Sequence, residues 1–411
     1  MYAQETDDPE DSHEVEPEQD AEEETESPDR YDIDPDQDDT ADIDTESTVD
    51  TVDHTSGWLF TGDFRPLLNY RDQDNRDGSR VSDASGRSRI RLKGAYGIAE
   101  GVQLGVRLAG RCTTDDCSPD WVWDRAAPGS NGLVDGQFTF DELYVHLYRR
   151  DKFNLTAGRQ QTRFVLRGGV FARSLDRNDS NNDNVTWTDG IHATFRRREG
   201  WSTHFIVQRN AADGSGSIRR GPLDFATSSA KNTYFLGSEN LNAAGPIVQR
   251  SLTISYLPDS LLKDGTVSGR RKDYWTVAGR LMGRWPQVAE GPRLRAGVEI
   301  GYAPETPTPA GAGIDTGVDG LAWNVVASFM DFRPRHNIGV NYARTGAGWL
   351  LSPQYRQNEE LFEIRYQWRP RNFPAIDARI RWRQDIEQPI GTLQKREVLD
   401  AFLRLTWQFG G

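Results

Sequence analysis

The chain has 411 residues, of which 36% are hydrophobic and 27% are charged, and its formal net charge is −14. No apolar run reaches the roughly 18 residues of a membrane-spanning helix, which excludes a helical membrane protein. Two cysteines, six histidines and three methionines are too few to favour a metal or redox enzyme, and the composition predicts no cofactor and no nucleic-acid partner.

The N-terminal segment, residues 1–56, carries most of the acidity. It holds 24 Asp or Glu and one arginine, Arg30, so its net charge is −23 and the remaining chain carries +9. Its low content of aliphatic and aromatic residues predicts a disordered, periplasmic extension. The run Asp32 to Asp38 is similar to a calcium loop, but the turn glycine is missing and Ile43 stands where a bidentate Glu belongs, so a solvated tail is favoured.

The start of the chain, Met1-Tyr2-Ala3-Gln4, is not a signal peptide. Tyr2-Ala3 before Gln4 has the small-residue character of a cleavage site, so the sequence is compatible with export.

From residue 57 onward, apolar and polar side chains alternate in segments of about ten residues, the length of a tilted strand that crosses a bilayer. The clearest segments are 89–93, 102–108, 294–302, 362–368, 376–382 and 403–409. Three arginines on one strand face are rare in a soluble sandwich. The sequence therefore predicts an all-β fold, a transmembrane antiparallel β-barrel over residues 57–411.

The connections between these segments support the barrel. Short joints at 99–101, 149–152, 198–200, 287–292, 332–336 and 369–374 alternate with long joints at 72–86, 112–136, 161–185, 258–272, 303–320, 345–357 and 385–396. Barrels of this kind have short periplasmic turns and long outer loops. The alternation fails only between 209 and 249, where parity requires one more strand at 232–237, followed by a short turn within 239–248. The predicted total is about 16 strands.

Tryptophans lie near the ends of these segments, as in the aromatic girdles of a membrane barrel. The alternative is ordinary core tryptophans in a soluble β protein. The residues concerned are Trp58, Trp187, Trp201, Trp275, Trp285, Trp368, Trp382 and Trp407.

The second long joint contains both cysteines, Cys112 and Cys117. An oxidising envelope compartment favours a disulfide between them. Because the closed loop is short, the bond is expected to stabilise the fold by only about 2 kcal/mol.

The third long joint, 161–185, carries Arg163, Arg167, Arg173 and Arg177 around Gly168-Gly169. Its apolar residues at 164–166 and 170–171 suit packing against an inner wall. We predict that it folds into the lumen as a cationic constriction; the alternative is a surface loop.

A family resemblance rests on three stretches: Asp141-Glu142-Leu143-Tyr144-Val145, Ala157-Gly158-Arg159-Gln160, and the run from Arg173 to Thr188-Asp189-Gly190. Together they resemble the alginate-export type of outer-membrane porin over about residues 58–200. Phosphate-selective porins are a second similar family. The resemblance implies a channel for an anionic solute or polymer with a cationic constriction.

The polar face of the strands must line the lumen if the apolar face meets lipid. Its cations exceed its carboxylates, which predicts attraction of anions; the alternative is a structural lattice of arginine–carboxylate pairs. The predicted selectivity residues are Arg89, Arg91, Arg107, Arg295, Arg365, Arg379, Arg381 and Arg383. Further lumen cations are Arg65, Lys93, Arg196, Arg280, Arg284, Arg369 and Arg404, and the carboxylates are Asp63, Glu142, Glu299, Glu363, Asp377 and Asp400.

Catalysis would require a nucleophile beside a base. His146, His192 and His204 fall on the polar face, but no serine stands obviously beside them, so neutral lumen residues are the favoured interpretation. No metal site is predicted, and the protein is not expected to be an enzyme.

The last strand, 403–409, ends on Trp407 and Phe409 and resembles the assembly signal of bacterial outer-membrane barrels, apart from Gly410 and Gly411. We therefore expect a passive, anion-preferring porin in the bacterial outer membrane, as a monomer or homotrimer. Its partners would be lipid, lipopolysaccharide, small anionic solutes and the barrel assembly machinery. The rivals are an acidic-polysaccharide export channel, a barrel-borne hydrolase, and an adhesion or structural barrel with a plugged lumen.

Overall fold

A computed structural model describes residues 57–123, 133, 136–149, 152–179, 185–210, 221–286, 291–352, 354–371 and 373–410. The predicted acidic extension, residues 1–56, lies outside the described residues. Within those ranges, no helix has the length and apolar character needed to cross a membrane.

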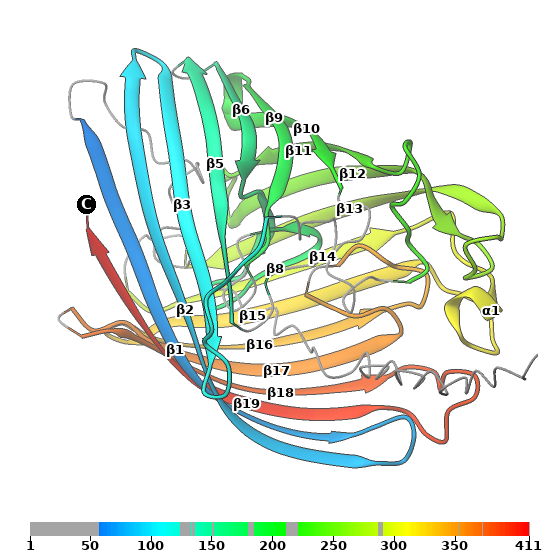
Figure 1. Cartoon of the computed structure of the whole chain (residues 1–411). Coiled ribbons are helices and arrows are strands. Elements are labelled where there is room, and N and C mark those ends of the chain that lie inside the picture. The colour runs from blue at the N-terminus through cyan, green and yellow to red at the C-terminus, as the bar shows by residue number, and fades with distance from the viewer. Residues whose placement is uncertain are drawn as a thin grey trace, which may run out of the picture.

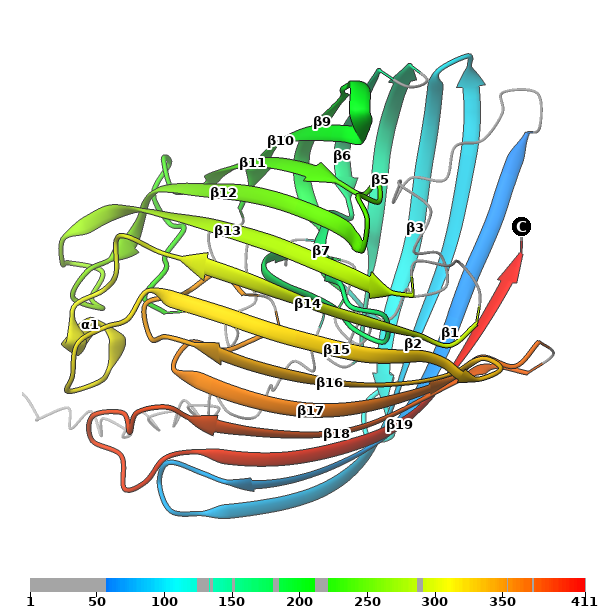
Figure 2. The ribbon, with the colours of Figure 1, turned by 180° about the vertical axis from the view of Figure 1, so that it is seen from behind.

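Sixteen long antiparallel strands form one closed wall (Figures 1 and 2). They are β1 (Trp58–Asp74), β2 (Arg80–Ala99), β3 (Val102–Thr113), β5 (Gln137–Arg149), β6 (Phe153–Gln160), β9 (Thr188–Arg196), β10 (Trp201–Arg209), β11 (Asn232–Asn240), β12 (Ile247–Leu262), β13 (Arg271–Trp285), β14 (Arg293–Tyr302), β15 (Leu321–Arg333), β16 (His336–Thr345), β17 (Glu359–Trp368), β18 (Ala375–Asp385) and β19 (Glu397–Gly410).

Five smaller elements complete the described part of the chain. The two-residue strand β4 (Asp120–Trp121) pairs in parallel with β5. β7 (Arg163–Arg167) and β8 (Ala172–Asn178) form a separate two-stranded sheet. The helices are a single 3-10 turn, Arg198–Gly200, and the four-residue α1 (Pro309–Ala312).

The wall closes because β1 pairs with both β2 and β19. Leu68 lies opposite Leu403 in β19, for example, and opposite Gly86 in β2. The prediction of an all-β antiparallel barrel with about 16 strands is confirmed. The strand that parity required is β11, which pairs with β10 and β12.

The connections sort to two ends of the barrel. Short joints, together with Gly57 and Gly410, lie at what we call the turn end, and the long joints lie at what we call the loop end. Figure 1 shows α1 among the loops at the loop end and the C-terminus on the opposite side. The short joints are 100–101, 150–152, 197–200, 241–246, 286–292, 334–335 and 369–374.

Two of the predicted long joints are wrong in extent. Most of 72–86 is strand, because β1 and β2 stay paired until Asp74 meets Arg80, leaving only 75–79 as a turn. Likewise, β12 and β13 leave only 263–270 of the predicted joint 258–272. Antiparallel pairing needs backbone hydrogen bonds alone, so the ladder continues through polar residues that the apolar pattern could not reveal.

Apolar side chains cover the outside of the barrel and polar side chains fill the inside. On β18, Ile380 is 58% exposed, whereas its neighbours Arg379 and Arg381 are each 2% exposed. On β14, Ile300 is 52% exposed and Glu299 is fully buried. This is the reverse of a water-soluble barrel and is the arrangement of a barrel surrounded by lipid.

The predicted girdle position is wrong for one tryptophan. Trp187 precedes β9 and is fully buried, because its ring packs on the guanidinium of Arg159 at 4.4 Å and its Nε1 donates to Asp189 at 3.0 Å. Trp58, Trp275, Trp285 and Trp407 are instead exposed on the outer face.

Cys112 and Cys117 form a disulfide, with a Cα–Cα distance of 4.6 Å, between the end of β3 and the following joint. Replacing both cysteines by serine should leave the barrel folded, because cross-linking so short a loop removes little chain entropy, about 2 kcal/mol. Heat-modifiable migration on a denaturing gel would measure this. A variant that fails to reach the compact, fast-migrating form would contradict the expectation.

Candidate functional site

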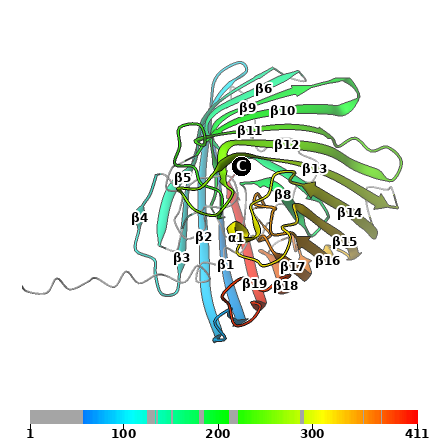
Figure 3. The same cartoon turned by 90° about the vertical axis from the view of Figure 1, so that its right-hand side faces the viewer.

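The hairpin of β7 and β8 lies inside the ring of wall strands (Figures 2 and 3). Its apolar residues Leu166, Val170 and Phe171 pack against Met282, Val326 and Met330 of the inner wall. The Gly168-Gly169 pair permits this approach: a Cβ on Gly169, whose φ is +86°, would lie 2.6 Å from the sulfur of Met330. The joint predicted to enter the lumen is therefore seated on one side of it.

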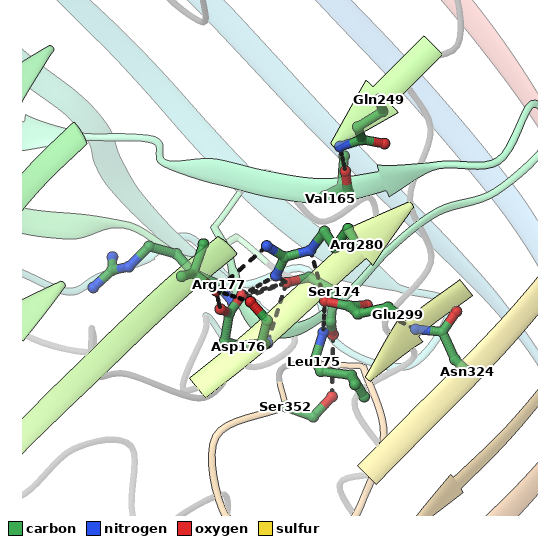
Figure 4. A network of polar contacts seen from close by, with 12 residues as sticks. Val165, Ser174, Leu175, Asp176, Arg177, Gln249, Arg280, Glu299, Asn324 and Ser352 are labelled. Atoms are coloured by element: carbon green, nitrogen blue, oxygen red, sulfur yellow. Dashed lines mark hydrogen bonds and ion pairs between the residues drawn. The ribbon is translucent and has the colours of Figure 1, made fainter. Parts of the chain in front are cut away.

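Buried polar contacts anchor β8 (Figure 4). The backbone N–H of Leu175 donates to the carboxylate of Glu299 at 3.0 Å, and Glu299 pairs with Arg280 at 2.7 Å. The guanidinium of Arg280 also pairs with Asp176 of the hairpin. Arg280 thus bridges a hairpin carboxylate and a wall carboxylate.

The four arginines of this joint have different positions. Arg173 pairs with Glu363 on β17 at 2.6 Å, and Arg177 donates to Thr188 at 2.8 Å and to Gln208 at 2.6 Å. Arg163 and Arg167 are half-buried at the ends of β7. Two of the four predicted constriction arginines therefore hold the hairpin to the wall.

A second segment, described at residues 346–352 and 354–358, also folds inward, which the sequence pattern did not predict. Trp349, Leu350 and Tyr355 are buried in one cluster with Leu175 of the hairpin. The indole N–H of Trp349 donates to the carbonyl of Leu175 at 2.8 Å. Burial raises the pKa of the Tyr355 hydroxyl above its usual value. The apolar run Trp349-Leu350-Leu351 could have predicted this burial, because three consecutive large apolar residues are unusual in a solvent-exposed loop.

The polar contacts of the hairpin run along β9 to β17, so the wall from β18 through β19, β1 and β2 to β3 faces it across the lumen. We call these five strands the basic wall. Its inward cations outnumber its carboxylates. The cations are Arg65, Arg89, Arg91, Lys93, Arg107, Arg111, Arg379, Arg381, Arg383 and Arg404, and the carboxylates are Asp63, Asp377, Asp385 and Asp400.

The predicted selectivity residues are gathered by this geometry with one exception. Arg379, Arg381 and Arg383 lie on β18, Arg89 and Arg91 on β2, and Arg107 on β3; Arg365 lies next to them on β17. Arg295 lies on β14, on the side covered by the hairpin, and is not brought together with the others.

The carboxylates of the region form ion pairs with these cations. Asp400 pairs with both Arg379 and Arg381, the latter at 2.8 Å. Asp63 pairs with Arg89 at 2.6 Å and Arg65 at 3.0 Å. Carboxylates of the flanking strands take part as well: Asp141 and Glu142 of β5 each pair with Arg107 at 2.8 Å, and Glu359 of β17 lies 3.8 Å from Arg383. The arginine–carboxylate lattice predicted as the alternative is thus present. With these three acids included, the cations of the basic wall still outnumber the carboxylates.

Phe402 on β19 orders the guanidinium groups of its neighbours. Arg379 lies 4.3 Å from its ring centroid, Arg404 5.3 Å and Arg365 5.7 Å. A cation packed on an aromatic face keeps its full charge while its rotamers are restricted. The ring therefore restricts three guanidinium groups, each of which also pairs with a carboxylate: Arg379 with Asp400, Arg404 with Asp377 at 3.0 Å and Arg365 with Glu363 at 3.5 Å.

The three inward histidines lie on β5, β9 and β10. His192 and His204 approach each other at 3.2 Å, and Phe164 of the hairpin packs edge-on against both rings. His146 contacts Thr156 at 2.9 Å. Their contacts are those of a packed polar cluster under the hairpin. Among the described residues, no group of three or more His, Cys, Asp or Glu is arranged to hold a metal ion.

Comparison with known proteins shows the fold. No family model matches the chain, and no curated protein matches it. A structure of Pseudomonas putida OprB is similar with a TM-score of 0.55 and 12% identity, covering 86% of this chain and 95% of that one. An anion-selective porin from Comamonas acidovorans is similar with a TM-score of 0.53 and 11% identity, covering 85% and 99%.

Proposed function

We propose that the protein is a passive, anion-preferring channel of the bacterial outer membrane. The observation that carries this proposal is the basic wall opposite a folded-in hairpin. Fixed guanidinium groups raise the local concentration of anions, and their planar forks can bind carboxylate or phosphate oxygens in pairs. Because Arg379, Arg381 and Arg383 alternate along one strand, their Cα atoms are about 6.5 Å apart, close enough for an anion to pass from one fork to the next.

The apolar outer face of the barrel supports the proposed location in the outer membrane. Exposed aliphatic side chains such as Ile300 and Ile380 require lipid rather than water around the barrel, and Trp58 and Trp407 suit the interfaces. Lipid and lipopolysaccharide would contact this face, and β19 would present the C-terminal assembly signal to the barrel assembly machinery.

Small anions are the favoured solutes: phosphate, carboxylates or acidic saccharides. The hairpin and the segment 346–358 take lumen space that a polymer would need, which disfavours polysaccharide export. The proposed role is transport rather than catalysis. The likeness to an anion-selective porin supports the proposal at the level of the fold.

Planar-bilayer recording tests the function. In a gradient of potassium chloride, the reversal potential of the purified full chain should report a higher permeability for chloride than for potassium, because the basic wall attracts the anion. Added phosphate should lower the chloride current by competing for the same arginines. Cation preference would contradict the selectivity, and absence of conductance would favour the plugged structural barrel.

A further inference from the structure

Exposed charge is distributed unequally between the two ends of the barrel. Among the described residues, exposed cations outnumber exposed acids at the turn end. The cations there are Arg149, Lys152, Arg197, Arg333 and Arg371, and the acids are Glu100 and Glu199.

Half-buried side chains extend this basic rim. The turn end also carries Arg196, Arg250, Arg284, Arg293, Arg335 and Arg369, against Glu239 and Asp331. One of these cations, Arg293, pairs with Asp331 at 3.1 Å. We call the exposed and half-buried cations together the turn-end rim.

The loop end has the opposite balance. Among its described residues, exposed acids outnumber exposed cations, and the cations are Arg80, Arg209, Arg270, Lys272, Arg344 and Lys395. Those acids are Asp77, Asp83, Asp115, Asp116, Asp120, Asp259, Asp264, Asp273, Asp315, Asp319 and Glu397. A basic rim is therefore a property of one end of the barrel, not of its whole surface.

The most acidic part of the chain is attached at the basic end. Residues 1–56 carry 24 Asp or Glu and a single arginine, and they join the barrel at Gly57, directly before β1. A chain of this length can span up to about 190 Å when extended. A ten-residue strand rises only about 33 Å, so the segment can reach the rim and the lumen behind it.

We propose that residues 1–56 bind the turn-end rim of their own barrel and extend toward the basic wall. The segment is then an internal polyanion that competes with anionic solutes for the same cations. Tethering makes the contact intramolecular, with an effective concentration on the order of millimolar, so many weak charge contacts suffice. The docking itself follows from charge complementarity; its effect on transport rests on the proposed function.

Limited proteolysis of the full chain in a nonionic detergent tests the docking. A glutamate-specific protease should cut the segment about tenfold more slowly than it cuts a free peptide of residues 1–56 at about 0.1 M salt, where charges interact over about 10 Å. At about 1 M salt the two rates should converge, because the screening length falls to about 3 Å. The free peptide corrects for any effect of salt on the protease.

Two charge-matched variants locate the docking surface. The rim variant should lose most of its protection at low salt, whereas the loop-end variant should keep it. The rim variant combines Arg149→Gln, Lys152→Gln, Arg197→Gln, Arg333→Gln and Arg371→Gln. The loop-end variant combines Arg80→Gln, Arg209→Gln, Arg270→Gln, Lys272→Gln and Lys395→Gln. All ten are exposed side chains, so both variants should fold.

Three outcomes would overturn the docking: cleavage as fast as the free peptide at both salt concentrations, protection that salt does not alter, or equal loss of protection in both variants. Planar-bilayer recording distinguishes a failure of the docking proposal from a failure of the proposed channel function. Changing Glu14, Glu16, Glu18, Glu22 and Glu23 to Gln should increase the chloride current at low salt if both proposals hold. Protection without anion preference would keep the docking and reject the function.

Discussion

Replacing Ile380 by arginine is expected to destabilise the barrel by about 2–4 kcal/mol if the residue lies near the middle of the membrane. Ile380 is 58% exposed on the outer face of β18, so the new guanidinium would face hydrocarbon. The free energy of unfolding in denaturant, measured in lipid vesicles, gives the size of the effect.

The matched control lies one residue away on the same strand. Lumen positions tolerate polar substitution, so changing Arg379 and Arg381 to Gln should lower anion preference and leave the fold intact. Because both arginines pair with Asp400, that buried carboxylate must be neutralised too, by Asp400→Asn. An unpaired buried Asp400 would destabilise the fold by about 3–5 kcal/mol. This loss of stability would be unrelated to anion selectivity.

The pair of variants decides which face of β18 meets lipid. If Ile380→Arg proves harmless while the neutral lumen variant unfolds, the strand is inside out and the basic wall does not line a passage. If Ile380→Arg destabilises the barrel, and the neutral lumen variant folds normally with unchanged anion preference, the face assignment holds and the arginines of β18 do not select the solute.

Replacing Arg280 by methionine is expected to release the inner hairpin from the wall. The guanidinium lies between Asp176 and Glu299, and all three side chains are essentially excluded from solvent. Removing the cation leaves two buried carboxylates side by side, at a cost of about 3–5 kcal/mol. Single-channel conductance should rise, because the hairpin no longer stays seated, and the free energy of unfolding should fall.

Arg293→Met is the control for this experiment. Arg293 pairs with Asp331 at 3.1 Å near the turn end, where both partners are partly exposed, so the pair contributes about 1 kcal/mol or less. Conductance should not change in this variant. Adding Asp176→Asn and Glu299→Gln to Arg280→Met should recover part of the stability. Wild-type conductance and stability in Arg280→Met would show that the hairpin is held by its apolar contacts instead.

Strand identity and face were predictable because they depend on local alternation. Successive side chains of a strand point to opposite faces, so local alternation predicts the face of each residue. Examples are Ile380 between Arg379 and Arg381, and Ile300 after Glu299. Even the hidden strand β11 followed from the rule that both ends of an even-stranded barrel lie on the same side.

The interior was less predictable because it depends on contacts between distant residues. The guanidinium of Arg173 meets Glu363 across 190 positions of sequence, and nothing near either residue indicates the partner. The inward course of 346–358 and the burial of Trp187 likewise arise from surfaces that exist only once the barrel has closed. The sequence pattern placed Trp187 near a strand end. It could not show that the guanidinium of Arg159 packs on the Trp187 ring inside the barrel.

The sequence by itself determined the closed β architecture, the outward apolar face, the cationic surplus of the inward face and the acidity of residues 1–56, because each depends on residue type and a period of two. Only the tertiary structure decided that Arg379, Arg381, Arg89 and Arg107 share one wall, that Arg295 lies apart from them, and that the exposed cations of the turns form one rim beside Gly57. Those relations come from the circular order of the strands, which brings β19 against β1 and sets side by side residues that lie more than 300 positions apart in the chain.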